Sequence, residues 1–150
     1  MNLWGRLAFS AALAMLASSP ALAGKCDAEG FVINVGNAFI SAARAGSPQA
    51  FTSAASRYAD LRSIALFALG PHRKQLPKAR EGEYVALTRA YMGRFMAKHA
   101  SKFAGSGIQV LSCTGNTVNA NIGGGKKLVF RLSGGRGGYR VQDVNASSIW

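Results

Sequence analysis

Acidic residues and histidines are scarce in this sequence of 150 residues. Six aspartates and glutamates stand against 18 lysines and arginines, for a formal net charge of +12, and there are two histidines. Acid–base catalysis and metal binding depend on clusters of such side chains, yet neither an HExxH motif nor paired CxxC motifs occur. A triad of Cys113, His99 and Asp143 has no spacing that supports it. We therefore predict no catalytic residues, no metal site, no cofactor and no enzyme activity.

Long apolar runs are also missing, because none reaches the roughly 20 residues of a membrane-spanning helix. The run Leu7–Ala17 follows one basic residue and precedes Pro20 and the small-x-small sequence Ala21–Ala23. This order is typical of a secretory signal peptide that is cleaved at the end of that sequence. We predict a signal peptide at residues 1–23 and a single exported domain at residues 24–150, which is long enough to hold a core.

Cysteine is limited to Cys26 and Cys113, and no CxxC spacing suggests a redox role. In an exported chain two cysteines favour a disulfide, although two unpaired thiols remain the alternative. A bond that closes so long a loop would stabilise the fold by about 4–5 kcal/mol in the chain-entropy account.

The first part of the exported chain has apolar residues at helical spacing. Ser47 followed by Pro48 is typical of a helix start, Asp60 can cap the next helix, and Gly70–Pro71 can end it. A basic connector, His72–Pro77, leads into the longest helix. The predicted helices are Glu29–Ala45, Pro48–Tyr58, Leu61–Leu69 and Lys78–Phe103.

After Gly105 the apolar period changes from 3.6 to 2, which predicts short strands. Turn clusters rich in glycine separate them. The predicted strands are Gln109–Ser112, Thr117–Ile122, Lys127–Leu132 and Tyr139–Val144. The pattern predicts an α+β fold in which three to four helices pack on a four-stranded antiparallel sheet.

Two glycine-rich stretches, Gly123–Lys126 and Gly134–Gly138, resemble a phosphate-binding loop and an RGG element. Both lie between predicted strands and are better explained as hairpin turns. The positive charge still leaves open a cationic exported module that binds nucleic acid or anionic membrane surfaces.

Aromatic residues of the last two predicted helices and of the sheet are candidates for a core or for the lining of a pocket. Periodicity alone does not separate a filled core from a lined cavity. The residues in question are Phe67, Tyr84, Tyr91, Phe95 and Phe130.

Three segments together resemble the MlaC family, which includes toluene-tolerance proteins and the hopanoid-associated HpnM proteins. They are Ala59–Gly70 with the sequence ADLRSIALFALG, Glu83–Tyr91 with EYVALTRAY, and Gly138–Val144 with GYRVQDV. Their order and separations also agree with the family, over roughly Phe31–Trp150.

The resemblance implies an MlaC-like α+β fold of cystatin-like or NTF2-like appearance. It implies a periplasmic protein that binds phospholipid in an apolar pocket and has no catalytic residues. Its implied partners are an inner-membrane ABC transporter complex and an outer-membrane lipoprotein complex. Lipid shuttling between them would maintain outer-membrane asymmetry, with transient contact at membrane surfaces and no nucleic acid.

The resemblance also suggests which side chains bind lipid. Matching positions within the three segments give Ile64, Phe67, Leu69, Leu87, Tyr91 and Val141. Periodicity alone adds Phe95, Phe130 and Leu132. Family members usually continue past the last strand into a C-terminal helical segment, whereas this sequence stops at Trp150. If the protein ends there, we expect the pocket to lack part of its wall.

Overall fold

The computed structural model describes residues 26–105 and 107–146. The predicted signal peptide, its cleavage site and the chain end at Trp150 lie outside the described residues. Four α-helices come first in this part of the chain: α1 (Glu29–Ala45), α2 (Pro48–Tyr58), α3 (Leu61–Ala68) and α4 (Glu81–Lys98). Four strands follow: β1 (Ile108–Thr114), β2 (Thr117–Ile122), β3 (Lys126–Ser133) and β4 (Arg140–Ala146).

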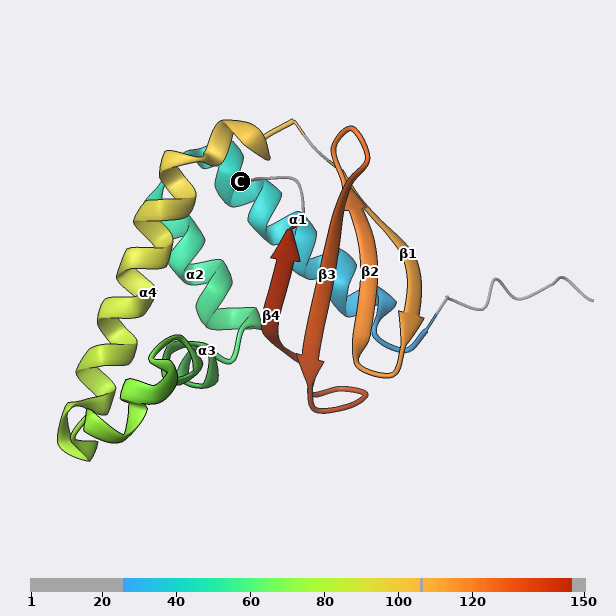
Figure 1. The fold of residues 1–150 in the computed structure, drawn as a ribbon. Helices are drawn as coiled ribbons and strands as arrows, with labels where there is room; N and C mark the ends of the chain where they lie inside the picture. Colours follow the sequence, from blue (N-terminus) through green and yellow to red (C-terminus); the bar gives the residue numbers. More distant parts are fainter. Residues whose placement is uncertain (1–25, 106, 147–150) are drawn as a thin grey trace, which may run out of the picture.

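The strands form one antiparallel sheet in the order β1-β2-β3-β4. Helix α1 lies across one face of this sheet, and α2, α3 and α4 lie beyond its β4 edge, with α4 outermost (Figure 1). The predicted α+β class with a four-stranded antiparallel sheet is confirmed.

Local signals set the helix ends. The backbone N–H of Ala50 donates to the hydroxyl of Ser47 at the start of α2, and the backbone N–H of Ser63 donates to the carboxylate of Asp60 at the start of α3, at 3.0 Å. Such caps satisfy amide groups that have no partner inside the helix. Gly46 ends α1 in the left-handed conformation, at φ 60°.

The predicted continuous helix Lys78–Phe103 is wrong. Short 3-10 segments, η2 (Lys78–Arg80) and η3 (Ala100–Lys102), flank α4 instead. The chain leaves the α conformation at His99, which has φ −107° and ψ 12°. An apolar pattern continues through such a break, because residues three apart lie on the same side of a 3-10 turn as well as of an α turn.

The predicted connector, the end of one predicted helix and the limits of three predicted strands also need correction. Six residues of the connector region form a 3-10 helix, η1 (Gly70–Gln75), in which the backbone N–H of His72 donates to the carbonyl oxygen of Leu69. Leu69 itself follows the last residue of α3 rather than ending it. Strand β2 has the predicted limits, and the ends of the other three strands differ from prediction by one or two residues, as is usual for element boundaries.

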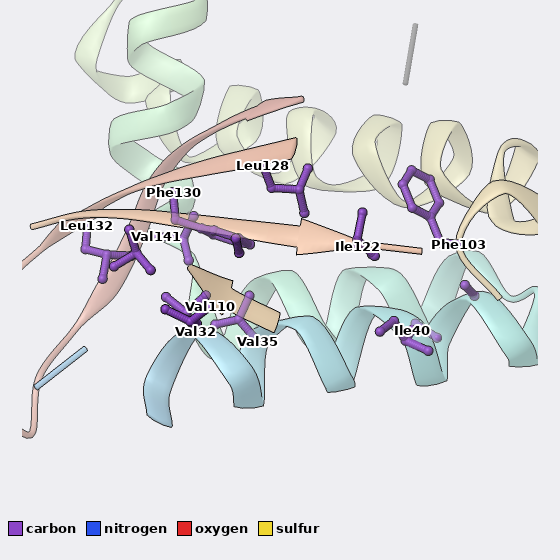
Figure 2. Close-up of a cluster of buried hydrophobic side chains, with 14 of the residues drawn as sticks. Val32, Val35, Ile40, Phe103, Val110, Ile122, Leu128, Phe130, Leu132 and Val141 are labelled. Atoms are coloured by element: carbon purple, nitrogen blue, oxygen red, sulfur yellow. The ribbon is translucent and has the colours of Figure 1, made fainter. Parts of the chain in front are cut away.

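The main core fills the space between α1 and the sheet (Figure 2). Val32 and Val35 from α1 meet Val110, Phe130 and other strand residues there, all less than a tenth exposed. A disulfide between Cys26 and Cys113 joins the segment before α1 to β1 across 87 residues of sequence.

The turn between α2 and α3 pairs with the edge of the sheet. Ala59 forms an isolated parallel bridge with Val141 of β4, and the backbone N–H of Asp60 donates to the carbonyl oxygen of Val141 at 2.8 Å. This contact attaches the helical layer to β4.

Candidate functional site

An apolar cavity of about 310 Å³ lies between the inner face of the sheet and the helices. Every α-helix contributes to it, and so does every strand. The lining side chains from helices include Val35, Phe39, Ala55, Tyr58, Ile64, Met92 and Met96. Those from strands include Ile108, Ile122, Leu128, Phe130, Val141 and Val144.

The cavity is open at β4. Val144 lies opposite Phe130 in the β3–β4 register, so the two side chains point to the same face of the sheet. Phe130 is 3% exposed but Val144 is 43% exposed. Helix α1 comes closest to β1, at the opposite edge of the sheet, and among the described residues the inner face at Val144 of β4 is only partly covered.

Helix α4 forms the far wall of the cavity. It packs chiefly on α2 and α3, and its methionines Met92 and Met96 line the cavity four residues apart. The i, i+4 spacing puts both on one face of the helix. Methionine side chains are flexible and adapt to irregular apolar spaces.

Three of the residues suggested by sequence line this cavity: Ile64 from α3, Phe130 from β3 and Val141 from β4. Leu132 is buried in the core between α1 and the sheet. Leu69 follows α3 and is half-buried.

The remaining suggested residues lie outside the cavity lining. Phe67 is 85% exposed, Leu87 59% and Tyr91 63%. Phe95 is half-buried and stacks on Tyr91, with ring centroids 6.1 Å apart. The helical spacing predicts an apolar stripe on α4, but it does not identify which residues of the stripe face the interior of the protein. Met92 and Met96, at the border of the stripe, line the cavity.

A second, basic pocket of about 490 Å³ adjoins the cavity. Arg62, Arg73 and Arg131 line it together with Phe67. The two pockets share Gln142 and Asp143 of β4. One strand thus separates an apolar space from a cluster of guanidinium groups.

One of these guanidinium groups already has a partner. Arg62 Nε donates to Glu81 Oε1 at 2.5 Å. Nearby, Asp60 accepts hydrogen bonds from the backbone and the hydroxyl of Ser63, which lower the pKa of its carboxyl group, with smaller contributions from Arg62 and Arg140.

Within residues 26–105 and 107–146, no helix is both long and apolar enough to cross a bilayer. Across these same stretches, no three histidine, cysteine, aspartate or glutamate side chains are grouped so that they could hold a metal ion.

The fold and the cavity together define an α+β protein with an apolar cavity between its helices and its sheet, a feature typical of proteins that bind apolar ligands. Residues 32–150 match the MlaC protein family, and the chain belongs to that family. Members of this family are periplasmic lipid-binding components of phospholipid transport. No curated protein matches the sequence in a direct comparison.

Proposed function

We propose that this protein is a phospholipid carrier that moves lipid between an outer-membrane lipoprotein complex and an inner-membrane ABC transporter complex. The observation that carries the proposal is the apolar cavity that opens at β4, in a chain of the MlaC family. Lipid contacts are proposed for Ile64, Phe130 and Val141, together with Met92 and Met96.

Burial of acyl chains provides the driving force. Each methylene group removed from water contributes about 0.8 kcal/mol. An acyl chain in the aqueous space between two membranes is therefore stabilised when a protein shields it from water. The side chains that line the cavity are apolar along nearly its whole length.

The basic pocket beside β4 is suited to the lipid phosphate. Guanidinium groups bind phosphate oxygens through paired, charge-assisted hydrogen bonds. Arg73 and Arg131 line this pocket, which shares Gln142 and Asp143 of β4 with the cavity. A lipid with its chain in the cavity would then present its phosphate outside, where a membrane complex can reach it.

The volume of the cavity indicates that a wall of the cavity must move before a phospholipid can enter. About 310 Å³ lies at the lower end of the range for ligand pockets, so the cavity as it stands admits a slender apolar group. Helix α4 is the wall best able to move outward, because it packs chiefly on other helices and presents methionines to the cavity.

The test is identification of lipid that copurifies with the protein, by mass spectrometry after denaturing extraction. Replacing both Met92 and Met96 with tryptophan would fill the cavity from the α4 side. We expect the wild-type protein to carry phospholipid and this double variant to lose most of it.

Leu87→Trp is the matched control, because it adds the same side chain to an exposed position of the same helix. It should retain lipid as the wild type does. Wild-type protein without lipid in repeated preparations, or unchanged lipid content in the folded double variant, would overturn the proposal.

A further inference from the structure

One exposed face of α4 combines apolar and basic side chains. Leu87, Tyr91, Arg94 and Lys98 follow one another at i, i+4, i+7 and i+11, so they lie along one side of the helix. All four are exposed. The order along the helix is two apolar residues followed by two cations.

Other residues of α4 face the protein. Gly93 lies against α2, where an added Cβ would stand 2.5 Å from Thr52 Cγ2. Met92 and Met96 line the apolar cavity. Among the described residues, no helix or strand covers Leu87 or Tyr91, which remain more than half exposed.

Arg94 also belongs to a basic groove of about 900 Å³ between α2 and α4. Arg57 and Arg89 line the same groove, with serine and threonine hydroxyls between them. No carboxylate lines it, and in the described stretches the ion pairs of Glu81, Glu83 and Asp27 are made with arginines outside this groove.

We propose that this face of α4, together with the basic groove, is a docking surface for an anionic lipid bilayer. Exposed apolar side chains next to lysine and arginine on a helix are typical of interfacial membrane binding. Leu87 and Tyr91 enter the headgroup region, where tyrosine is favoured. Arg57, Arg89, Arg94 and Lys98 contact lipid phosphates.

A nucleic acid matches only half of this surface. It supplies phosphates for the arginines but no apolar phase for Leu87, which is 59% exposed. An anionic bilayer supplies both. The proposal does not depend on the cavity, because neither Leu87 nor Tyr91 lines it.

The experiment is cosedimentation of the purified protein with vesicles of equal parts phosphatidylglycerol and phosphatidylcholine, at low salt. Pure phosphatidylcholine vesicles and a short DNA duplex are the comparison arms. We expect clear binding to the mixed vesicles and much weaker binding to phosphatidylcholine, since each cation near an anionic surface contributes about a fivefold gain in affinity.

Two variants test the two halves of the surface. Leu87→Ser with Tyr91→Ser should reduce vesicle binding at least tenfold and leave DNA binding unchanged. Arg89→Gln with Arg94→Gln should reduce vesicle binding about 25-fold, from two factors of about five. The control, Lys126→Gln with Lys127→Gln on β3, removes the same charge elsewhere and should reduce it much less.

If the α4 charge variant and the β3 control lose vesicle binding equally, the proposal is overturned, because the binding is then due to general electrostatic attraction. The proposal would also be overturned if the Leu87/Tyr91 variant bound vesicles as the wild type does, or if this variant lost DNA binding together with vesicle binding. The Met92/Met96 tryptophan variant should still bind vesicles, which separates failure here from failure of the carrier proposal. Unfolding midpoints of all variants establish that they are folded.

Discussion

Gly93 of α4 lies against Thr52 of α2 at a distance that excludes any side chain larger than hydrogen. A Cβ at Gly93 would stand 2.5 Å from Thr52 Cγ2 and 2.7 Å from the carbonyl oxygen of Pro48. The contact holds α4 close to α2 along one side. Met92, one residue earlier, then turns toward the cavity.

Replacing Gly93 with alanine should destabilise the protein by about 1–3 kcal/mol, because the added methyl group forces the two helices apart. Urea unfolding monitored by circular dichroism measures the change. Gly82→Ala is the matched control in the same helix, since nothing lies within 4 Å of its added Cβ. It should be neutral or stabilise by up to about 1 kcal/mol; equal destabilisation by both variants would contradict the close-contact explanation.

Asp60→Ala should cost about 0.5–2 kcal/mol, because α3 loses its N-terminal cap. Asp60→Asn keeps an amide oxygen that can accept the same hydrogen bond. It should therefore retain most of the stability at neutral pH. Thermal unfolding of the three proteins at pH 7 compares them.

The pH dependence of these proteins gives a separate prediction. Hydrogen bonds from Ser63 lower the pKa of Asp60 below its ordinary value of 3.8. The stabilisation is therefore complete above that value and is lost as the pH falls through the lower pKa of the folded protein. Asp60→Asn should lack this part of the acid destabilisation. An identical acid profile for wild type and Asp60→Asn would show that the carboxylate makes no such contribution.

Loss of the disulfide should lower the free energy of unfolding by about 4–5 kcal/mol, because Cys26 and Cys113 close a loop of 87 residues. The double serine variant and the wild type in dithiothreitol should show the same unfolding midpoint. If dithiothreitol leaves the unfolding midpoint of the wild type unchanged, the disulfide does not constrain the unfolded chain.

A charge at the open side of the cavity should reduce lipid retention with little effect on folding. Val144→Lys places an ammonium group there, and its position is already 43% exposed. The amount of copurified lipid per protein is the measurement. Val129→Lys on the other face of β3 is the control and should retain lipid; equal loss in both would point to a general effect of charge on the sheet.

The helix limits that were predicted correctly depend on residues close together in the sequence. The limits of α1 and α2 follow from apolar spacing and from Gly46 and Ser47. The break at His99 was missed, because a 3-10 turn preserves the apolar pattern that suggested a continuous helix.

The sequence indicated only part of the lining of the candidate cavity. Ile64, Phe130 and Val141 do line the cavity, whereas Leu87 and Tyr91 are exposed. Local spacing identifies the apolar residues of a helix, but the neighbouring elements decide which of them face inward.

The sequence by itself determined the α+β class, the antiparallel sheet and the resemblance to one family, because these depend on period, caps and short motifs. Only the tertiary structure decided where an empty apolar space remains. That space exists because α1 packs closest to β1, whereas β4 at the opposite edge faces helices that pack mainly on one another. Such packing depends on residues distant in sequence, which no local pattern contains.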